Sequence, residues 1–248
     1  MKICIAQTAS LKGTVQKNIQ NHLQIIERAV LLEADLIIFP ELSITGYEPG
    51  LAKALSTNIE DDLFRPFQKL ADKNGITIGV GMPTHTIDGI NISMLIFQPS
   101  KEPIKYAKQM LHTDEEPYFV CGNKQAFINI NGKKIAVGIC YETLQRAHFL
   151  NAKEQGADIY IASVAKPQGG IEKAYLHFPK IASEFDTPIL MSNCIGFCDN
   201  FLSVGQSAAW NNNGELVGQL DNENQGLLIY DTELNTAASY PLEMISKP

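Results

Sequence analysis

The sequence predicts an α/β protein, because of how its apolar residues recur. Short, strand-length apolar runs alternate from one end of the chain to the other with longer segments whose apolar residues recur at helical spacing. This alternation is typical of sheets covered by helices rather than of helical bundles or β-sandwiches. Neither an internal repeat nor a low-complexity linker nor a shift in composition divides the chain, so we expect a single domain over residues 1–248.

The first half of the chain predicts strands and helices in turn. Strands are expected at residues 2–7, 35–39, 76–80 and 91–98, and helices at about 15–32 and 61–74. The first helix is amphipathic, since its apolar side chains recur every three or four residues, at Ile19, Leu23, Ile26 and Val30. The strand at 35–39 is apolar almost throughout, which predicts that it is fully buried. A loop punctuated by Pro and Gly follows it, at residues 40–50.

The second half begins with a hairpin. Strands at 126–130 and 133–139 flank Asn131-Gly132, the favoured pair for a type I′ turn, in which both central residues need positive φ. Helices are expected at about 144–155 and 172–185, and strands at 158–163 and 188–192. After Phe201 the chain is strand-rich, with turns at 211–214 and 221–226.

Composition and charge limit the class of partner. The formal net charge is −7 and no block of Lys and Arg concentrates positive charge, which argues against nucleic acid or an anionic membrane as the main partner. No apolar run approaches the roughly 20 residues of a membrane helix, and the strand-like start has no cleavable hydrophobic leader. We therefore expect a cytoplasmic protein with a small-molecule partner and reduced cysteines, of which there are five.

Glu41 is the first candidate for chemistry. It follows the buried strand at 35–39 directly, so its carboxylate is expected at the rim of the core. Desolvation there would raise its pKa towards the range of a general base. The alternative is an ordinary exposed acid in a loop.

Lys108 is the second candidate. It stands between aromatic and apolar residues and is followed by the acidic run Asp114-Glu115-Glu116, so it could be a positioned cation with its counter-charge. The alternative is an ordinary surface lysine.

Cys140 is the third candidate, at the end of the strand at 133–139 and at the expected start of a helix. Unpaired backbone N–H groups at a helix N-terminus lower the pKa of a thiol, which favours the nucleophilic thiolate, and the same groups could hold an oxyanion. The alternative is a small buried residue, which is how we interpret Cys4, Cys121, Cys194 and Cys198. Cys194 and Cys198 lack the further ligands of a metal site.

The order of these three signals resembles the nitrilase, or carbon–nitrogen hydrolase, superfamily. The resemblance is specific at Phe39-Pro40-Glu41-Leu42 with Thr45-Gly46-Tyr47, at Tyr106-x-Lys108 before Tyr118-Phe119, and at Gly138-Ile139-Cys140-Tyr141-Glu142. It spans the whole chain, from Ala6-Gln7 to Gly205-Gln206-Ser207.

The resemblance implies a four-layer α-β-β-α sandwich and a Glu–Lys–Cys triad. Glu41 would be the general base, Lys108 the cation that supports the tetrahedral intermediate, and Cys140 the nucleophile, with the backbone N–H of Tyr141 as a second oxyanion donor. A further glutamate that orients substrate or water would be Glu115 or Glu116, with Glu115 the better alignment. No metal or organic cofactor is expected. The family also implies a homodimer.

The segment after Cys140 departs from the family. Many relatives read Tyr-Asp-x-Arg-Phe-Pro there, whereas this chain reads Tyr141-Glu142-Thr143-Leu144-Gln145-Arg146. That loop lines the pocket in the family, so we expect the departure to affect which substrate the pocket binds. Our candidates for pocket residues or their immediate supports are Tyr141, Glu142, Leu144, Gln145 and Lys166.

The expected reaction is hydrolysis of a small linear amide through a Cys-linked thioester, with release of ammonia and a carboxylic acid. An N-carbamoyl amine or amino-acid hydrolase and a nitrile hydrolase are alternatives in the same class. A protein that binds a small molecule on this fold without turnover is an alternative of a different class. His112, His148 and His177 could in principle serve Cys140 as a base, but Glu41 and Lys108 match that role better.

Overall fold

The computed structural model describes residues 1–242; the last six residues of the expected single domain lie outside this range. Its helices are α1 (Val15–Leu31), α2 (Ala52–Leu55), α3 (Arg65–Asn74), α4 (Arg146–Glu154) and α5 (Gln168–Glu184), with short 3-10 turns at Pro49–Leu51, Asp62–Phe64 and Cys140–Leu144. Its strands are β1 (Lys2–Gln7), β2 (Leu36–Ile38), β3 (Thr77–Thr86), β4 (Gly89–Phe97), β5 (Ile104–Ala107), β6 (Phe127–Ile130), β7 (Lys133–Ile139), β8 (Ile159–Val164), β9 (Ile189–Asn193), β10 (Ile195–Cys198), β11 (Phe201–Val204), β12 (Ala208–Trp210), β13 (Leu216–Gln219), β14 (Gly226–Asp231) and β15 (Thr236–Pro241).

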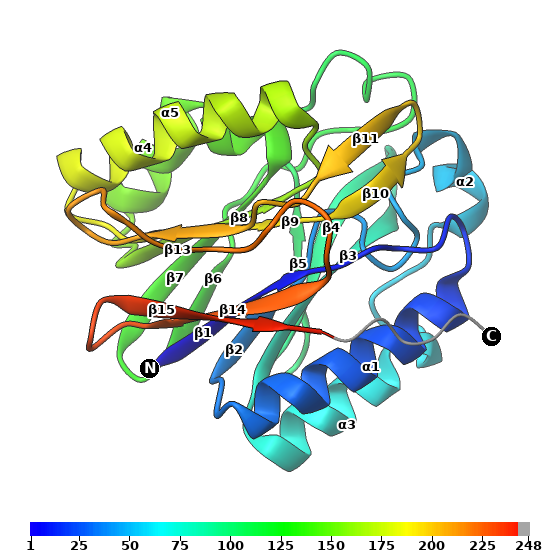
Figure 1. The fold of residues 1–248 in the computed structure, drawn as a ribbon. Helices are drawn as coiled ribbons and strands as arrows, with labels where there is room; N and C mark the ends of the chain where they lie inside the picture. Colours follow the sequence, from blue (N-terminus) through cyan, green and yellow to red (C-terminus); the bar gives the residue numbers. More distant parts are fainter. Residues whose placement is uncertain (243–248) are drawn as a thin grey trace.

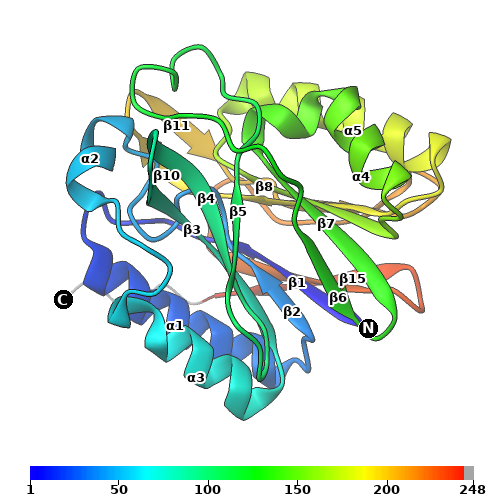
Figure 2. The same cartoon turned by 180° about the vertical axis from the view of Figure 1, so that it is seen from behind.

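Two large sheets pack face to face between two layers of helices (Figure 1). Within residues 1–242, one sheet has the order β15-β14-β1-β2-β3-β4-β5 and the other the order β13-β12-β9-β8-β7-β6, with β10 and β11 forming a separate pair. Helices α1 and α3 cover the first sheet and α4 and α5 cover the second, as the view from behind also shows (Figure 2). The expected α-β-β-α sandwich is confirmed.

Strand β2 illustrates why the layers form. Its apolar residues alternate between faces, so that Leu36 and Ile38 enter the core between the two sheets, whereas Ile37 and the following Phe39 face α1 and α3. All four side chains are fully buried. A strand that is apolar at consecutive positions is therefore sandwiched on both sides, as its sequence predicts.

The hairpin prediction is confirmed, and several boundaries differ from the expected ones. Asn131 and Gly132 have φ of 50° and 77°, as a type I′ turn requires. Helix α5 begins at Gln168 rather than near 172, because two glycines that read as a loop in the sequence form its first turn. The short strand β5 was not predicted; its four residues alternate too briefly to stand out.

The loops with candidate functional residues follow strands of both sheets. Glu41 follows β2, Lys108 follows β5 and Cys140 follows β7. Two serine hydroxyls join the sheets near these loops: Ser163 Oγ donates to the Phe39 carbonyl at 2.8 Å, and Ser192 Oγ donates to the Ala6 carbonyl at 2.7 Å. The loops that carry the candidate functional residues of the two sheets are thus fixed relative to each other.

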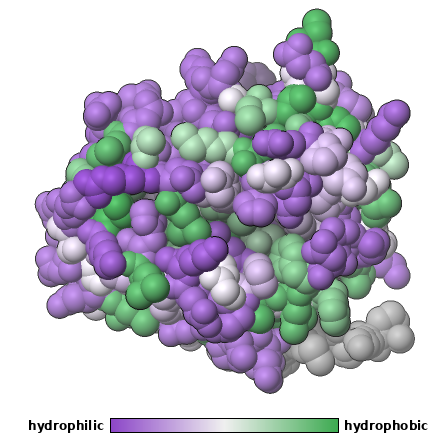
Figure 3. Space-filling model, turned by 90° about the horizontal axis from the view of Figure 1, so that it is seen from above, coloured by the Kyte–Doolittle hydropathy of each residue, from purple (hydrophilic) through white to green (hydrophobic). Residues whose placement is uncertain are grey.

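The face that carries α4 and α5 is largely hydrophilic, with hydrophobic residues scattered over it (Figure 3). In the described part of the chain, none of the helices combines the length and the apolar character needed to cross a membrane.

Candidate active site

Glu41 lies in the core rather than on the surface. Its exposed fraction is 2%, so the alternative of an exposed loop acid is wrong. The loop that carries it packs directly on β3, where a Cβ at Gly81 would come within 2.3 Å of the Leu42 backbone nitrogen. Only glycine allows this approach, which holds the Glu41 carboxylate against Lys108.

Lys108 joins two buried carboxylates. Its Nζ donates to Glu41 Oε1 at 2.8 Å and to Glu115 Oε1 at 2.6 Å, and all three side chains are almost entirely buried. Glu115 is itself fixed, because it accepts from Tyr47 Oη at 2.9 Å and from the His112 backbone N–H at 2.7 Å. An ammonium group has three donors, so one hydrogen of Lys108 remains available after these two bonds.

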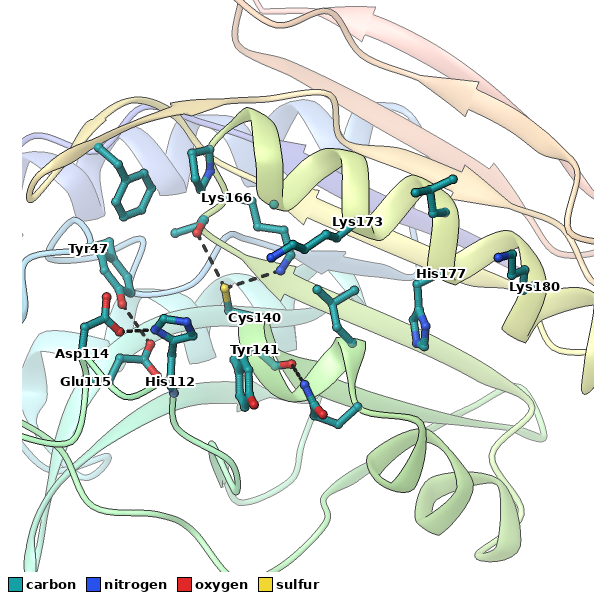
Figure 4. Close-up of a pocket in the computed structure, with 17 residues that line it drawn as sticks. Tyr47, His112, Asp114, Glu115, Cys140, Tyr141, Lys166, Lys173, His177 and Lys180 are labelled. Carbon is teal, nitrogen blue, oxygen red and sulfur yellow. Dashed lines mark hydrogen bonds and ion pairs between the residues drawn. The ribbon is translucent and has the colours of Figure 1, made fainter.

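Cys140 occupies a strained position between β7 and a 3-10 turn. Its φ is 47°, in the left-handed region that residues with a Cβ rarely adopt. Strand β7 lies close to β8 just before it: a Cβ at Gly138 would meet Tyr160 Oη at 2.4 Å. The Cys140 Sγ faces Lys166 Nζ at 3.8 Å and the Ala165 carbonyl at 3.6 Å (Figure 4). The strained residue is thus one whose side chain lines a cavity.

The pKa values of these groups are linked. Burial raises the pKa of Glu41 to about 7, against the lowering effect of Lys108. Burial would lower the pKa of Lys108, but its negative neighbours, Glu41 foremost, hold that pKa above its ordinary value. Lys108 is therefore an ammonium group across the physiological pH range, while Glu41 can hold or release a proton near neutrality.

The expected lowering of the thiol pKa is wrong for the resting site. Burial and the nearby Glu41 raise the pKa of Cys140 to about 12, and Lys166 and Lys108 only partly offset this. The expected helix start is a five-residue 3-10 turn, whose dipole is too short to outweigh desolvation. The resting thiol is protonated and needs a base, and Glu41 Oε2 has no hydrogen-bond partner among residues 1–242.

A cavity of about 720 Å³ opens over Cys140. Tyr47, His112, Tyr141 and Phe201 form aromatic walls, and the first residues after β8 and one face of α5 close the other side. Figure 4 shows Lys166 and Lys173 pointing to the Cys140 end, with His177 and Lys180 further along α5. Glu41 and Lys108 are not among the lining residues and lie behind this cavity.

The structure separates the remaining candidates. Glu115 contacts Lys108, whereas Glu116 is exposed and lies outside the cavity. Tyr141, Leu144, Gln145 and Lys166 line the cavity as expected.

Glu142 does not line the cavity: it is fully buried and accepts hydrogen bonds behind Cys140, from Ile139 N at 2.7 Å and Tyr106 Oη at 2.5 Å. Of the two expected roles, pocket residue or immediate support, the structure gives Glu142 the second: it supports the loop of Cys140.

The four other cysteines also differ from one another. Cys4, Cys194 and Cys198 are buried as expected, but Cys121 is exposed, so its interpretation as a packing residue is wrong.

Sequence reasoning missed several lining residues. Tyr47 was part of a motif but had no role; its hydroxyl binds Glu115. Lys173 and Lys180 were not considered, and His177 was weighed only as a base for Cys140, although their spacing along α5 places all three on one helical face.

The family assignment rests on a match over nearly the whole described chain. The family model described as Carbon-nitrogen hydrolase matches residues 2–242. The chain belongs to this family. It is therefore an enzyme of the class that hydrolyses carbon–nitrogen bonds.

Individual relatives are distant. The chain is 25% identical to the glutamine-dependent NAD(+) synthetase of Synechocystis sp., over 92% of this chain and 46% of that protein. It is 26% identical to a protein of Schizosaccharomyces pombe named a probable nitrilase, over 82% of this chain and 77% of the other. The chain thus spans less than half the length of the NAD(+) synthetase.

Among solved structures, the NitN amidase from Nesterenkonia sp. AN1 superposes with a TM-score of 0.85 at 22% identity, covering 93% of this chain and 92% of the amidase. At that identity the likeness concerns the fold.

Proposed function

We propose that the protein is a thiol hydrolase that cleaves the C–N bond of a small linear amide and releases ammonia and a carboxylic acid. The observation that carries this proposal is the buried Lys108 ammonium bound to Glu41 at 2.8 Å and to Glu115 at 2.6 Å behind the Cys140 cavity. Burying three charged groups costs folding free energy, and such clusters are rarely the most stable choice for a core. Their presence therefore favours a role in chemistry.

In the first half-reaction, Cys140 Sγ attacks the carbonyl carbon of the amide and its proton passes to Glu41. Glu41 Oε2 is suited to this step because it has no partner among residues 1–242 and the pKa of Glu41 is raised to about 7. The C–N bond then breaks and the proton moves from Glu41 to the departing nitrogen, which leaves as ammonia. A thioester on Cys140 remains.

The negative charge that develops on the carbonyl oxygen is stabilised by hydrogen-bond donors that are already in position before the attack. We assign these to the third hydrogen of Lys108 and to the Tyr141 backbone N–H, at the start of the 3-10 turn. In the second half-reaction Glu41 takes a proton from water, the hydroxyl attacks the thioester, and the carboxylic acid and the Cys140 thiol are released.

Lys166 is a second cation at the nucleophile. Its Nζ is 3.8 Å from Cys140 Sγ and its side chain is buried, and its charge partly offsets the rise in the pKa of the thiol. We assign it to stabilising the negative charge that passes through the sulfur during attack and release.

The substrate class is supported by relatives. Structures of variants of the Nesterenkonia amidase contain butyramide, or acrylamide added to the active-site cysteine. Several curated relatives are glutamine-dependent NAD(+) synthetases. A cavity of about 720 Å³ is large enough for an acyl chain of several carbons.

The proposal is tested by ammonia release from a panel of short amides, ω-amides including glutamine, N-carbamoyl compounds and nitriles. We expect release from linear amides by the wild type and none by Cys140→Ala. Release only from carbamoyl compounds or nitriles would replace the amide assignment. Binding without any release, together with no acyl adduct, would favour the non-catalytic alternative.

A further inference from the structure

The cavity beyond Cys140 has an uneven distribution of charge. Three basic side chains of α5 line it, at Lys173, His177 and Lys180. They are separated by four and three residues, so they form one stripe along the helix, about 10 Å from Lys173 to Lys180. The protein as a whole carries a net charge of −7, so this stripe is not a consequence of overall composition.

The carboxylates among the lining residues already have partners. Glu115 is bound to the Lys108 ammonium, and Asp114 Oδ1 lies 2.6 Å from His112 Nδ1. By contrast, neither Lys173 nor Lys180 forms an ion pair with any carboxylate within residues 1–242. The charge left uncompensated along this wall is positive.

His177 adds a polar atom that lacks a partner. Its Nε2 is buried and accepts or donates no hydrogen bond among the described residues. Burial and the positive neighbours Arg146, Lys166 and Lys180 lower the pKa of His177, which reports a positive potential at this point. A buried, unpartnered ring nitrogen costs stability unless a ligand satisfies it.

The stripe begins at the Cys140 end, where Lys173 points, and continues along α5 to His177 and Lys180. Leu144 and Leu176 line the cavity with the basic residues. A ligand that fits has a reactive carbonyl at Cys140, a few methylene groups along the apolar wall, and an anionic end towards α5.

We propose that the preferred substrates are amides whose acyl chain ends in a carboxylate, and that Lys173, His177 and Lys180 bind that carboxylate. This inference rests on the proposed amidase function and adds the substrate class. The basic stripe also attracts anionic substrates to the site while the net negative charge of the protein repels them elsewhere.

The test compares amides of equal carbon number that differ in terminal charge: succinamate with butyramide, and glutaramate with pentanamide. We expect kcat/KM to be at least about 10-fold higher for the charged member of a pair, which corresponds to about 1.4 kcal/mol. Raising the ionic strength should increase KM for succinamate more than for butyramide. Equal rates for both members, or faster cleavage of the neutral one, would overturn the inference.

Variants of α5 test which residues cause the preference for a charged substrate. Lys173→Gln combined with Lys180→Gln should lower the ratio of kcat/KM for succinamate to that for butyramide by about 10-fold or more, mainly through KM. The matched control is Lys69→Gln, which removes an exposed lysine from α3 on the other side of the molecule. A ratio unchanged in the double variant would contradict the assignment to α5.

Calorimetry separates this inference from the proposed function. Succinamate should bind Cys140→Ala more tightly than butyramide does, and the double lysine variant in that background should lose the difference. If the wild type cleaves no amide, the proposed function fails. If it cleaves butyramide as well as succinamate, the function stands and the carboxylate subsite is refuted.

Discussion

The Glu142 carboxylate joins the loop of Lys108 to the loop of Cys140: its Oε2 accepts from the Gln109 backbone N–H at 2.6 Å. Its other oxygen accepts from Ile139 N, the residue before Cys140, at 2.7 Å. One buried side chain thus fixes the backbone on either side of the site, from two different sheets.

Glu142→Gln should lower kcat more than it changes KM, because Gln cannot accept at both ends without turning a donor towards a backbone N–H. We expect a loss of about 10- to 100-fold in kcat, measured with butyramide. Glu116→Gln is the control, since Glu116 is exposed. A loss confined to KM would argue that Glu142 contacts substrate after all.

Neighbouring glutamates should respond differently to the same change. Glu115→Gln removes the negative charge beside Lys108 and one of the two oxygens that accept from Lys108, Tyr47 and the His112 backbone, so we expect kcat/KM to fall by about 100-fold or more. Glu116→Gln should leave kcat/KM within about twofold. Similar losses in the two variants would mean that the auxiliary role is wrongly assigned.

The activity should rise with pH through about 7. Burial raises the pKa of Glu41 to about 7, so below that value Glu41 is protonated and cannot accept the thiol proton. Each unit of pH below this range should lower kcat/KM about tenfold, and the profile should level off above it. A kcat/KM that does not change between about pH 5 and pH 8 would contradict Glu41 as the base.

Removing the central cation should destabilise the fold. Lys108→Met leaves Glu41 and Glu115 buried without their partner, which we expect to cost about 3–5 kcal/mol of unfolding free energy in urea. Adding Glu41→Gln and Glu115→Gln should recover part of that stability without restoring activity. A triple variant no more stable than Lys108→Met would show that the charges are not the cause.

The homodimer implied by the family resemblance remains a prediction. Sedimentation at micromolar concentration should give the mass of two chains or a multiple of it. A monomer at that concentration would refute the prediction.

The places of Glu41 and Cys140 at the ends of strands could be predicted from the sequence, because the apolar pattern marks where those strands end. Lys108 could be singled out only by its flanking residues and the family resemblance, since β5 before it was not predicted. The sequence left open whether Glu142 lines the pocket or supports it, because the direction of a carboxylate two residues from Cys140 depends on the 3-10 turn, which directs it inward. The raised pKa of Cys140 depends on burial and on the distant Glu41, which only the packing of the two sheets determines.

The basic stripe of α5 could have been noticed in the sequence, since Lys173, His177 and Lys180 lie at helical spacing. Which way that stripe faces depends on how α5 packs against β8 and β9, where Ala174, Phe178 and Ile181 turn towards the sheet. Without that packing, a row of basic residues is most simply read as a solvated surface.

The most direct test of the central claim is mass spectrometry of the protein quenched with acid during turnover of butyramide. We expect an added butyryl group on the peptide that contains Cys140, and a Cys121→Ser background excludes adducts on the exposed thiol. The adduct should be absent from Cys140→Ala. Steady release of ammonia with no acyl group on Cys140, or release that persists in Cys140→Ala, would contradict a thioester mechanism at this site.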